Sequence, residues 1–444
     1  MVGNRTGPSR RALLTGGLAT GALATLPRPG RASSAGPRIS VMVVAASQFR
    51  GLELRTPEFT RATGIAVDYL TTPFRNLQQK VSAVGVAHDG GVDIVTYMDA
   101  WGPSNAYWYE DLTPLMARDG LGLDRYPAAF HPACRSGGRI TGLPVRGAAQ
   151  TFYYRRDLFD RHGLSAPATW TDVIDAGRRL ATLEPSIAPL NLYFGNDGSQ
   201  QNLFVWLSLI WSAGGDLFAA NGAPLLTSAV VADATRFYID LHRRYAIANR
   251  GSVSFVEKDA AISFAQGKAA MAPLWSWNIG QFMDRSRSVL TPDQVGFVPM
   301  PAVVADRPSV AYANVFPMSI NRYSGQKEAA WAYLKWLSDP ALERRNALEK
   351  QVAGQVLDNN IVVQRSNLSD PTISAANGGT LALAANALET GRVCPQMEDW
   401  PEIGETLSNM ITRAANGQDI DRLLARAQRD VIATLRRGGL DIDG

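Results

Sequence analysis

The sequence predicts an α/β fold with a mostly parallel sheet, and three observations support that class. Short apolar runs alternate with helical patterns along residues 38–97, the order that builds strand–helix–strand units. The chain has 444 residues with 46% apolar content, which is enough for two substantial cores. The sequence contains no internal repeat and no low-complexity linker, so two lobes would be joined by strands and not by a flexible tether.

The expected elements of the first unit come from local patterns. Its strands are residues 38–44, 65–69 and 93–97, and its helices are residues 51–63 and 76–86. The first run is apolar almost throughout, as in a buried parallel strand. Gly64 ends the first helix at the position where a C-cap favours glycine.

Two further strands are expected where the chain leaves this unit, and further helices are expected where apolar residues recur at helical spacing. Residues 139–144 and 149–154 are typical of strands. Thr169, with Asp172 three residues on, predicts a capped helix start. Further helices are expected to include residues 173–180, 234–241, 330–337 and 419–436, the third ended by Asp339 and Pro340.

The N-terminus is typical of an export signal. Arg10 and Arg11 precede a weakly apolar run over residues 12–26, and small residues at 32–35 suit a signal peptidase. Paired arginines with a mild apolar run resemble the Tat signal, so residues 1–35 are excluded from the fold and cleavage is expected near Ala35. No cysteine lies near that stretch, and lipid anchoring is therefore not expected.

Composition argues against several functions of the mature chain. The 44 basic minus 40 acidic residues give +4, but residues 1–35 hold five arginines and no acid, so the balance becomes 39 minus 40, or −1. The mature protein therefore offers no global electrostatic case for nucleic acid. Four scattered histidines form no metal-ligand pattern, and no cofactor or metal is expected. Cys134 and Cys394 are compatible with a disulfide and equally with two buried thiols.

A series of moderately specific motifs covers nearly all of residues 38–436. They are EFTRATGIAV at 58–67, GVDIV at 91–95, GLP at 142–144, YYRRDLF at 153–159, PATWTD at 167–172, FAQGKAAM at 264–271, KEAAW and LKWL within 327–337, and PQM before Trp400. Their order resembles that of extracellular solute-binding proteins of sugar-binding family 1, the group that includes maltose-binding protein. FAQGKAAM is the most specific match, and YYRRDLF and PATW also resemble the polyol-binding branch.

The resemblance implies a two-lobed periplasmic-binding-protein fold of the class II type, in which each lobe is a mostly parallel sheet flanked by helices. A hinge closes the cleft between the lobes. By this analogy the N-terminal lobe holds residues 37–146 and 309–350, and the C-terminal lobe holds 147–308 and 351–444. The implied function is that of a monomeric, non-enzymatic receptor that captures a sugar or sugar alcohol and passes it to the membrane permease subunits of an ABC importer.

Sugars and polyols need two kinds of partner, which directs the choice of candidate residues. Hydroxyls need donors and acceptors, whereas C–H faces need flat apolar rings, which Trp and Tyr supply at little entropic cost. Trp275 and Trp277 follow an expected strand and face the same way. The resemblance places a sugar-stacking Trp here and another aromatic platform near Trp400. Core packing is the alternative explanation for the paired indoles.

Other candidates stand near expected strand ends, where open α/β sheets bind ligands. Asp99 is expected to accept from ligand hydroxyls, or alternatively to cap a helix. The remaining candidates are Gln48, Tyr97 and Trp101 after strands, Arg146 at the first crossover between lobes, Tyr312 and Asn314 at the second, and Gln201 as the weakest.

Two other function classes compete with this interpretation. An exported carbohydrate-active enzyme could use a carboxylate pair such as Asp99 with Glu398, but nothing in the sequence fixes their separation. No dinucleotide fingerprint, nucleophile elbow or zinc-protease motif is present. A receptor for a polyamine, peptide or anion would need several carboxylates or an arginine-rich site, and the aromatic-rich candidates fit these less well.

Overall fold

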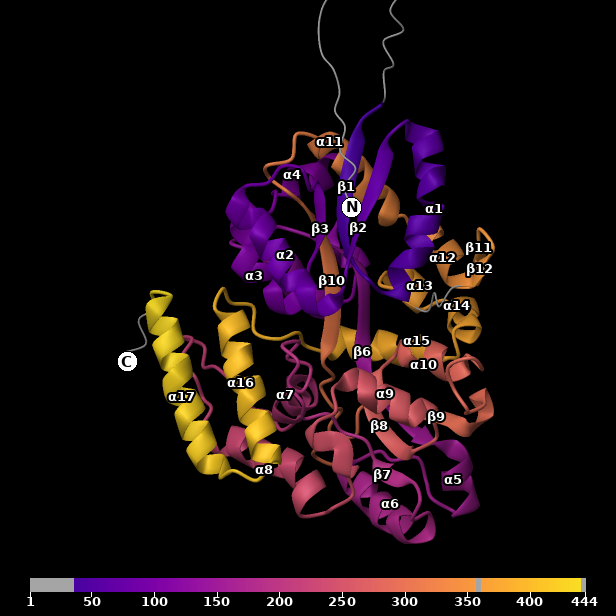
Figure 1. The fold of residues 1–444 in the computed structure, drawn as a ribbon, viewed down its shortest axis with the longest axis vertical. Helices are drawn as coiled ribbons and strands as arrows, with labels where there is room; N and C mark the ends of the chain where they lie inside the picture. The colour runs from indigo at the N-terminus through magenta and orange to yellow at the C-terminus, as the bar shows by residue number, and fades with distance from the viewer. Residues whose placement is uncertain (1–35, 357–360, 441–444) are drawn as a thin grey trace, which may run out of the picture. The chain divides into compact units, whose positions relative to one another are not determined.

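The computed structural model describes residues 36–356 and 361–440, with only the backbone of Ser47, Gln48 and Val356. The expected leader, residues 1–35, lies outside the described residues. The described part is a mixed α/β structure in which helices flank one large sheet, and it confirms the predicted fold class (Figure 1).

The sheet has eight strands in the order β2-β1-β3-β10-β6-β8-β7, with β9 also paired to β6. They are β1 (Arg38–Val44), β2 (Ala66–Thr72), β3 (Ile94–Thr96), β6 (Leu143–Arg155), β7 (Ala188–Leu190), β8 (Ala269–Trp275), β9 (Val295–Val298) and β10 (Ala313–Ile320). β1 runs parallel to β2 and β3, and β7 to β8, whereas β6 runs antiparallel to β8, β9 and β10. The second lobe is thus less parallel than predicted, because β6 enters it against the direction of its neighbours.

β6 and β10 are the strands that pass between the lobes, and they lie side by side in Figure 1. The first part of β6, from Leu143 to Ala149, pairs with β10, and the second part, from Gln150 to Arg155, pairs with β8 and β9. The sequence analysis expected two separate strands in this region, at 139–144 and 149–154. The structure instead has the short strand β5 (Arg139–Ile140) and, from Leu143 onward, the single long strand β6, because the residues between 144 and 149 also pair with β10.

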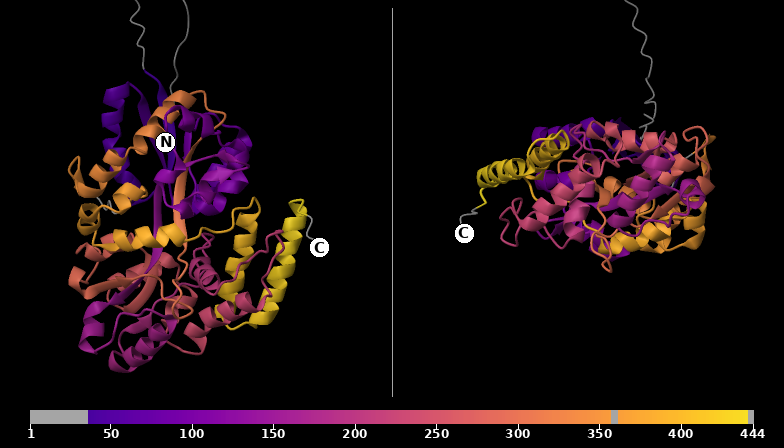
Figure 2. Two further views of the ribbon diagram at one scale, coloured as in Figure 1. Left: turned by 180° about the vertical axis from the view of Figure 1, so that it is seen from behind. Right: turned by 90° about the horizontal axis from the view of Figure 1, so that it is seen from below.

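Helices cover the sheet in both lobes (Figure 2). Around the first lobe lie α1 (Ser47–Thr63), α2 (Phe74–Ala87), α3 (Gly102–Asn105), α4 (Thr113–Arg118), α11 (Lys327–Leu337) and α12 (Pro340–Leu348). The second carries α5 (Arg156–Arg161), α6 (Trp170–Leu183), α7 (Leu203–Ser212), α8 (Ala229–Arg243), α9 (Glu257–Ala265) and α10 (Asn278–Met283). The C-terminal part adds α13 (Arg365–Leu368), α14 (Pro371–Ala376), α15 (Thr380–Thr390), α16 (Trp400–Ala415) and α17 (Ile420–Arg437).

Smaller elements complete the fold. The 3-10 helix η1 (Asp99–Trp101) follows β3, and two short hairpins are formed by β4 (Arg135–Ser136) with β5 (Arg139–Ile140) and by β11 (Gln351–Val352) with β12 (Gln355–Val356). α15 packs against β6, at the level where the strand passes from one lobe to the other (Figure 1).

The predicted helix ends agree with local chemistry. Gly64 takes φ +75°, a conformation that costs glycine little, and its N–H donates to the Thr60 carbonyl. The side chains of Thr169 and Asp172 form both bonds of a capping box at the start of α6. α1 begins at Ser47, one turn before the predicted start at residue 51.

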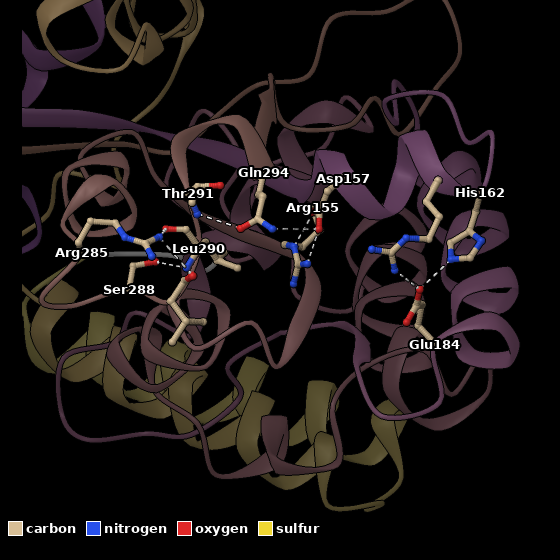
Figure 3. Close-up of polar contacts among 11 residues, drawn as sticks. Arg155, Asp157, His162, Glu184, Arg285, Ser288, Leu290, Thr291 and Gln294 are labelled. Carbon is tan, nitrogen blue, oxygen red and sulfur yellow. Dashed lines mark hydrogen bonds and ion pairs between the residues drawn. The ribbon is translucent and has the colours of Figure 1, made fainter.

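The far end of β6 is fixed by polar contacts (Figure 3). The Arg155 guanidinium donates to both carboxylate oxygens of Asp157, at 2.7 and 2.5 Å. The Gln294 amide donates to the same carboxylate, and its oxygen accepts from the Thr291 N–H at 2.9 Å. These bonds connect the C-terminal end of β6 to the segment that enters β9.

The described residues show three further features that bear on function. Cys134 and Cys394 are both free and buried. In the described part of the chain, no helix is long and apolar enough to span a bilayer. No group of three or more His, Cys, Asp or Glu side chains in that part could hold a metal ion.

Candidate ligand-binding site

One face of the linking strands carries most of the predicted site. Opposed residues of antiparallel strands project their side chains on the same side, and the register pairs Arg146 with Phe316 and Gln150 with Trp275. Arg146 and Gln150 are four residues apart on β6 and share a face by alternation. The Gln150 N–H donates to the carbonyl of Tyr312, so the pairing of β6 with β10 continues to the residue just before β10.

Asp99 forms a buried hub on this face. Its Oδ2 accepts from the Tyr312 hydroxyl at 2.6 Å and from the Cys394 thiol at 3.3 Å. Its Oδ1 accepts from the Asn314 amide at 2.8 Å and from the Val315 N–H at 3.4 Å. A carboxylate offers about four acceptor positions, so protein donors already occupy those of Asp99. The carboxylate binds β10 and Cys394 and does not cap a helix.

Burial determines the electrostatics of this hub. Desolvation raises the pKa of Asp99 from 3.8 to about 6, although the Tyr312, Cys394 and Val315 hydrogen bonds oppose the rise. The pKa values of Tyr312 and Cys394 are also raised, chiefly by their own burial and then by the Asp99 charge. Both groups therefore stay protonated and act as donors at neutral pH.

A surface groove of about 530 Å³ reaches the Cys394 side of the hub. Cys394, Gln396 and Arg392 are among the residues that line it. The Gln396 amide donates to the Cys394 carbonyl at 2.8 Å, and its oxygen is buried without a partner. Polar groups of the segment between α15 and α16 therefore line the groove next to the hub.

Aromatic rings, with the Arg146 guanidinium among them, form a series of stacked, tilted and edge-to-face contacts through the same region, which we call the aromatic run. In order of contact its members are Trp101, Phe74, Phe316, Arg146, Trp277, Trp275, Phe204, Tyr312 and Trp211. Successive centroids lie between 4.0 and 6.0 Å apart, distances typical of stacked and edge-to-face pairs. The run begins on η1 and α2 of the first lobe and ends on α7 of the second.

Arg146 is the one cation within the aromatic run. Its guanidinium carbon lies 4.3 Å from the Trp277 ring centroid and 4.5 Å from that of Phe316. A guanidinium group at this distance from an aromatic ring is stabilised by cation–π attraction. The residue is only 8% exposed, its Nε has no hydrogen-bond partner, and burial lowers its pKa to about 9.

Two other polar groups beside the aromatic run keep an unpaired atom. Gln150 is fully buried and donates to the Tyr193 hydroxyl at 3.2 Å, while its Oε1 has no partner. Glu257, the first residue of α9, has a buried and unpaired Oε1, and burial raises its pKa to about 7. Asn278 lowers this pKa by a side-chain hydrogen bond, and the positive charge of Arg146 lowers it further. We call Arg146, Gln150 and Glu257 the polar trio.

The structure brings together most of the residues proposed from sequence. Those in the aromatic run or the Asp99 hub are Trp275, Trp277, Arg146, Tyr312, Trp101, Asp99 and Asn314. Trp400 begins α16, is 1% exposed, and lies on a helix that packs against η1.

Two proposed residues, Tyr97 and Gln201, are not brought into this group. Tyr97 is buried elsewhere in the first lobe, where its hydroxyl bonds to the Ala133 carbonyl and its ring stacks on Tyr109. Gln201 is half-buried just before α7, and its carbonyl accepts from the Phe204 N–H at 3.1 Å. The side chain of Gln48 lies outside the described residues.

Sequence reasoning missed Gln150, Glu257, Phe316 and Cys394, whereas Phe204 was weighed only as a weaker candidate. Gln150 carried a usable signal, because it is a polar residue within an apolar strand pattern. Glu257 carried none, since an acid at a helix start is ordinarily explained by the helix dipole.

Comparisons with known proteins agree with this architecture. A model of the bacterial extracellular solute-binding proteins matches residues 46–343. The mannitol-binding protein of Pseudomonas aeruginosa is 26% identical over 405 residues, which are 84% of this chain and 87% of that protein. A protein of Sinorhizobium fredii, named "Probable amino-acid ABC transporter periplasmic-binding protein y4oP", is 25% identical over 348 residues, 76% of this chain and 75% of that one.

A solved structure shares the fold. An ABC transporter solute-binding protein from Agrobacterium radiobacter K84, in complex with ribitol, superimposes with a TM-score of 0.77 at 23% identity, covering 89% of this chain and 98% of that one. The matched family model spans well over half of the present chain. The protein therefore belongs to the bacterial extracellular solute-binding proteins, a family of binding proteins that serve ABC transporters outside the cytoplasm.

Proposed function

We propose that this protein captures an uncharged sugar or sugar alcohol between its two lobes and closes on it. The observation that carries the proposal is the aromatic run beside the polar trio. Flat rings suit the C–H faces of a polyol, and the unpaired donor of Arg146 and unpaired acceptors of Gln150 and Glu257 suit its hydroxyls. A buried polar atom without a partner costs about 1–3 kcal/mol, which a ligand hydroxyl would offset.

The origin of the residues supports closure around the ligand. Trp101 and Phe74 come from the first lobe, Trp275 and Trp277 from the second, and Arg146 from the strand between them. A ligand that contacts all of these groups binds the closed form better than the open form, and it shifts the equilibrium by that difference in affinity. We further propose that permease subunits recognise the closed protein.

The names of relatives favour the same ligand class. One curated relative is a mannitol-binding protein, and one solved neighbour holds ribitol. Both are acyclic polyols, so short linear polyols are the first ligands to test.

Export and oligomeric state belong to the same proposal. We propose that residues 1–35 direct Tat export, that cleavage occurs near Ala35, and that the mature protein acts as a monomer. Mass spectrometry of the exported protein and light scattering of the purified protein test these statements.

A specific observation favours one other ligand class, the zwitterionic amino acids. Arg146 and Glu257 have opposite formal charges and could receive a carboxylate and an ammonium group, and one relative is named for amino-acid transport. A small amino acid has no apolar face long enough to match the aromatic run, so this ligand class ranks second.

The test is a thermal-shift screen followed by calorimetry on the mature protein, because a ligand that binds only the native state raises the melting temperature. The panel contains D-mannitol, ribitol, sorbitol, maltose, L-alanine and L-glutamate. Saturable binding of a polyol or sugar without product formation is expected. Binding of L-alanine alone would overturn the carbohydrate proposal, and turnover of a sugar would overturn the receptor function.

A further inference from the structure

Gln150 lies at the point of β6 where the partner strand changes. Ala149 pairs with Ala313 of β10, whereas Gln150 pairs with Trp275 of β8. Directly opposed residues of antiparallel strands project to the same side of a sheet, so the Gln150 amide and the Trp275 indole share one surface. Both residues are buried, at 0% and 2% exposed. A polar amide is therefore buried beside the ring that is proposed to stack on the ligand.

Only one end of this amide is used. The Gln150 Nε2 donates to the Tyr193 hydroxyl at 3.2 Å, while Oε1 is buried and has no hydrogen-bond partner among the described residues. A hydroxyl both donates and accepts, so a hydroxyl of the ligand fits the free end of the amide. The Asp99 carboxylate on the same face does not compete for that hydroxyl, because four donors of the protein already surround it.

Tyr193 holds the bonded end of the amide and is itself held. It follows β7 and is fully buried. On either side of it, the N–H of Leu192 donates to the Ser252 hydroxyl at 3.1 Å, and the N–H of Phe194 donates to the Ser252 carbonyl at 2.8 Å. These bonds fix the backbone that carries the Tyr193 ring. The free end of the Gln150 amide therefore has a defined position before a ligand arrives, which reduces the entropy lost on binding.

The neighbouring indole is fixed in the same way. The Trp275 N–H donates to the Asn278 side-chain oxygen at 2.8 Å, and the Trp275 carbonyl accepts from the Tyr153 hydroxyl at 3.0 Å. A polyol with its C–H face on an indole carries its hydroxyls at the margin of that face. An amide on the same surface of the sheet is placed to bond one of them.

We propose that Gln150 is a specificity-determining residue that bonds one hydroxyl of the ligand, and that Tyr193 is the positioning residue that orients its amide. The inference rests on the proposed function, in which the ligand lies against Trp275. It deepens that function because it states which analogues the protein rejects. A deoxy analogue leaves the buried amide end unpaired, and a site built around a hydroxyl discriminates strongly against a solute that lacks it.

The experiment uses D-mannitol and its 1,6-, 2,5- and 3,4-dideoxy derivatives. The two halves of mannitol are related by two-fold symmetry, so removing both equivalent hydroxyls prevents the ligand from turning round to restore a lost bond. Calorimetry on the mature protein measures each solute with the wild type and with Gln150→Met, which keeps an unbranched side chain and removes the amide. Gln150→Leu is the second variant if the methionine protein does not fold.

The chain offers matched controls for both residues. Thr151 is the next residue of β6, and its hydroxyl is also buried without a partner. It pairs with Leu274 and faces the opposite surface by alternation, so Thr151→Val removes a comparable group away from the proposed site. For Tyr193→Phe the control is Tyr238→Phe, because the Tyr238 hydroxyl is buried without a partner. Circular dichroism and melting curves verify that each variant is folded.

The decisive quantity is the ratio of mannitol affinity to the affinity for each derivative. For one derivative, Gln150→Met should lower this ratio by about tenfold or more, and the other two ratios should stay near their wild-type values. Tyr193→Phe should lower the same ratio by a smaller factor. Both control variants should keep every ratio. A purely structural role would change the melting temperature, or the affinity for all solutes equally, and would leave the ratios unchanged.

Two results would overturn the inference. A folded Gln150→Met protein that keeps all three wild-type ratios would exclude Gln150 as the hydroxyl-bonding residue. A Tyr193→Phe protein that behaves as Tyr238→Phe does would exclude the positioning role of Tyr193.

Failure of the proposed function gives a different pattern. If the wild type binds L-alanine and no polyol, the carbohydrate proposal fails, and the same variants are measured with L-alanine, whose ammonium group can donate to the Gln150 Oε1. A loss of about tenfold in Gln150→Met but not in Thr151→Val would retain Gln150 as a ligand-bonding residue. Equal affinity of the wild type and Gln150→Met for L-alanine would exclude that role as well.

Discussion

The Tyr312 hydroxyl donates to the Asp99 carboxylate at 2.6 Å, and the two residues are 213 positions apart in the chain. The bond joins the 3-10 helix that follows β3 to the segment that enters β10. Because Tyr312 also stacks on Phe204, with ring centroids 4.0 Å apart, the same residue connects the hub of the first lobe to a helix of the second. Changes at this pair should therefore affect stability and ligand binding together.

Tyr312→Phe should destabilise the protein by about 1–3 kcal/mol, since it removes a donor from a buried carboxylate and leaves that charge less solvated. Chemical unfolding of the ligand-free protein measures this change. Tyr109→Phe is the matched control, because the Tyr109 hydroxyl is buried without a partner and its removal should cost little or nothing. Equal losses in the two variants would contradict the role given to the Asp99 bond.

Asp99 should make stability rise as the pH falls from 7 to 5. Its pKa is about 6 in the folded protein and near 3.8 when it is exposed, so the folded state binds more protons in this range. The contribution is about 1.3 kcal/mol over those two pH units.

Unfolding curves at several pH values measure this effect, and Asp99→Asn should remove it. Asp119 has a pKa that is lowered, first by a hydrogen bond from Trp331, so Asp119→Asn should leave the slope between pH 5 and 7 unchanged. A slope that Asp99→Asn does not alter would show that other groups produce it.

Trp275→Ala should weaken ligand binding by roughly 1–3 kcal/mol if the indole lies against the solute. Calorimetry with the best polyol of the screen gives the affinity. Trp336→Ala is a suitable control, because that ring packs on Phe59 and Tyr333 in the first lobe and away from the aromatic run. Unchanged affinity in a folded Trp275→Ala protein would refute the stacking role.

Both thiols should be slow to react with a water-soluble disulfide reagent in the native protein. Cys134 and Cys394 are buried, and desolvation raises the pKa of each, which keeps the unreactive thiol form. Two thiols should react once the protein is denatured without reductant. No reactive thiol under that condition would indicate a disulfide and contradict the free state of these residues.

The sequence predicted the fold class well because its strands and helices follow strong local patterns. The capped start of α6 and the glycine end of α1 depend only on neighbouring residues, and both were found at the expected positions. We did not predict β6 as one long strand, because Arg146 and Gly147 interrupt the apolar pattern of the sequence. In the structure, pairing with β10 continues the strand through these two residues.

The site was harder to predict, since it depends on where distant segments meet. Trp275 and Asp99 could be proposed because they follow expected strands, where open α/β sheets bind ligands, and Arg146 and Tyr312 because they stand at the expected crossovers between the lobes. The same reasoning placed Tyr97 at the site, yet its ring turns into the core and stacks on Tyr109. Glu257 could not be proposed, since its burial arises only when α9 packs against β8.

The passage of β6 through both lobes has a consequence for sequence change. Side chains along a strand alternate between its two surfaces, so Arg146 and Gln150 share a surface only while an odd number of residues separates them. One residue inserted between them would turn Gln150 to the opposite surface, although each lobe could still complete its own core. The spacing along this strand therefore tolerates paired insertions far better than single ones, and length variation here should alter what the protein recognises before it alters whether the protein folds.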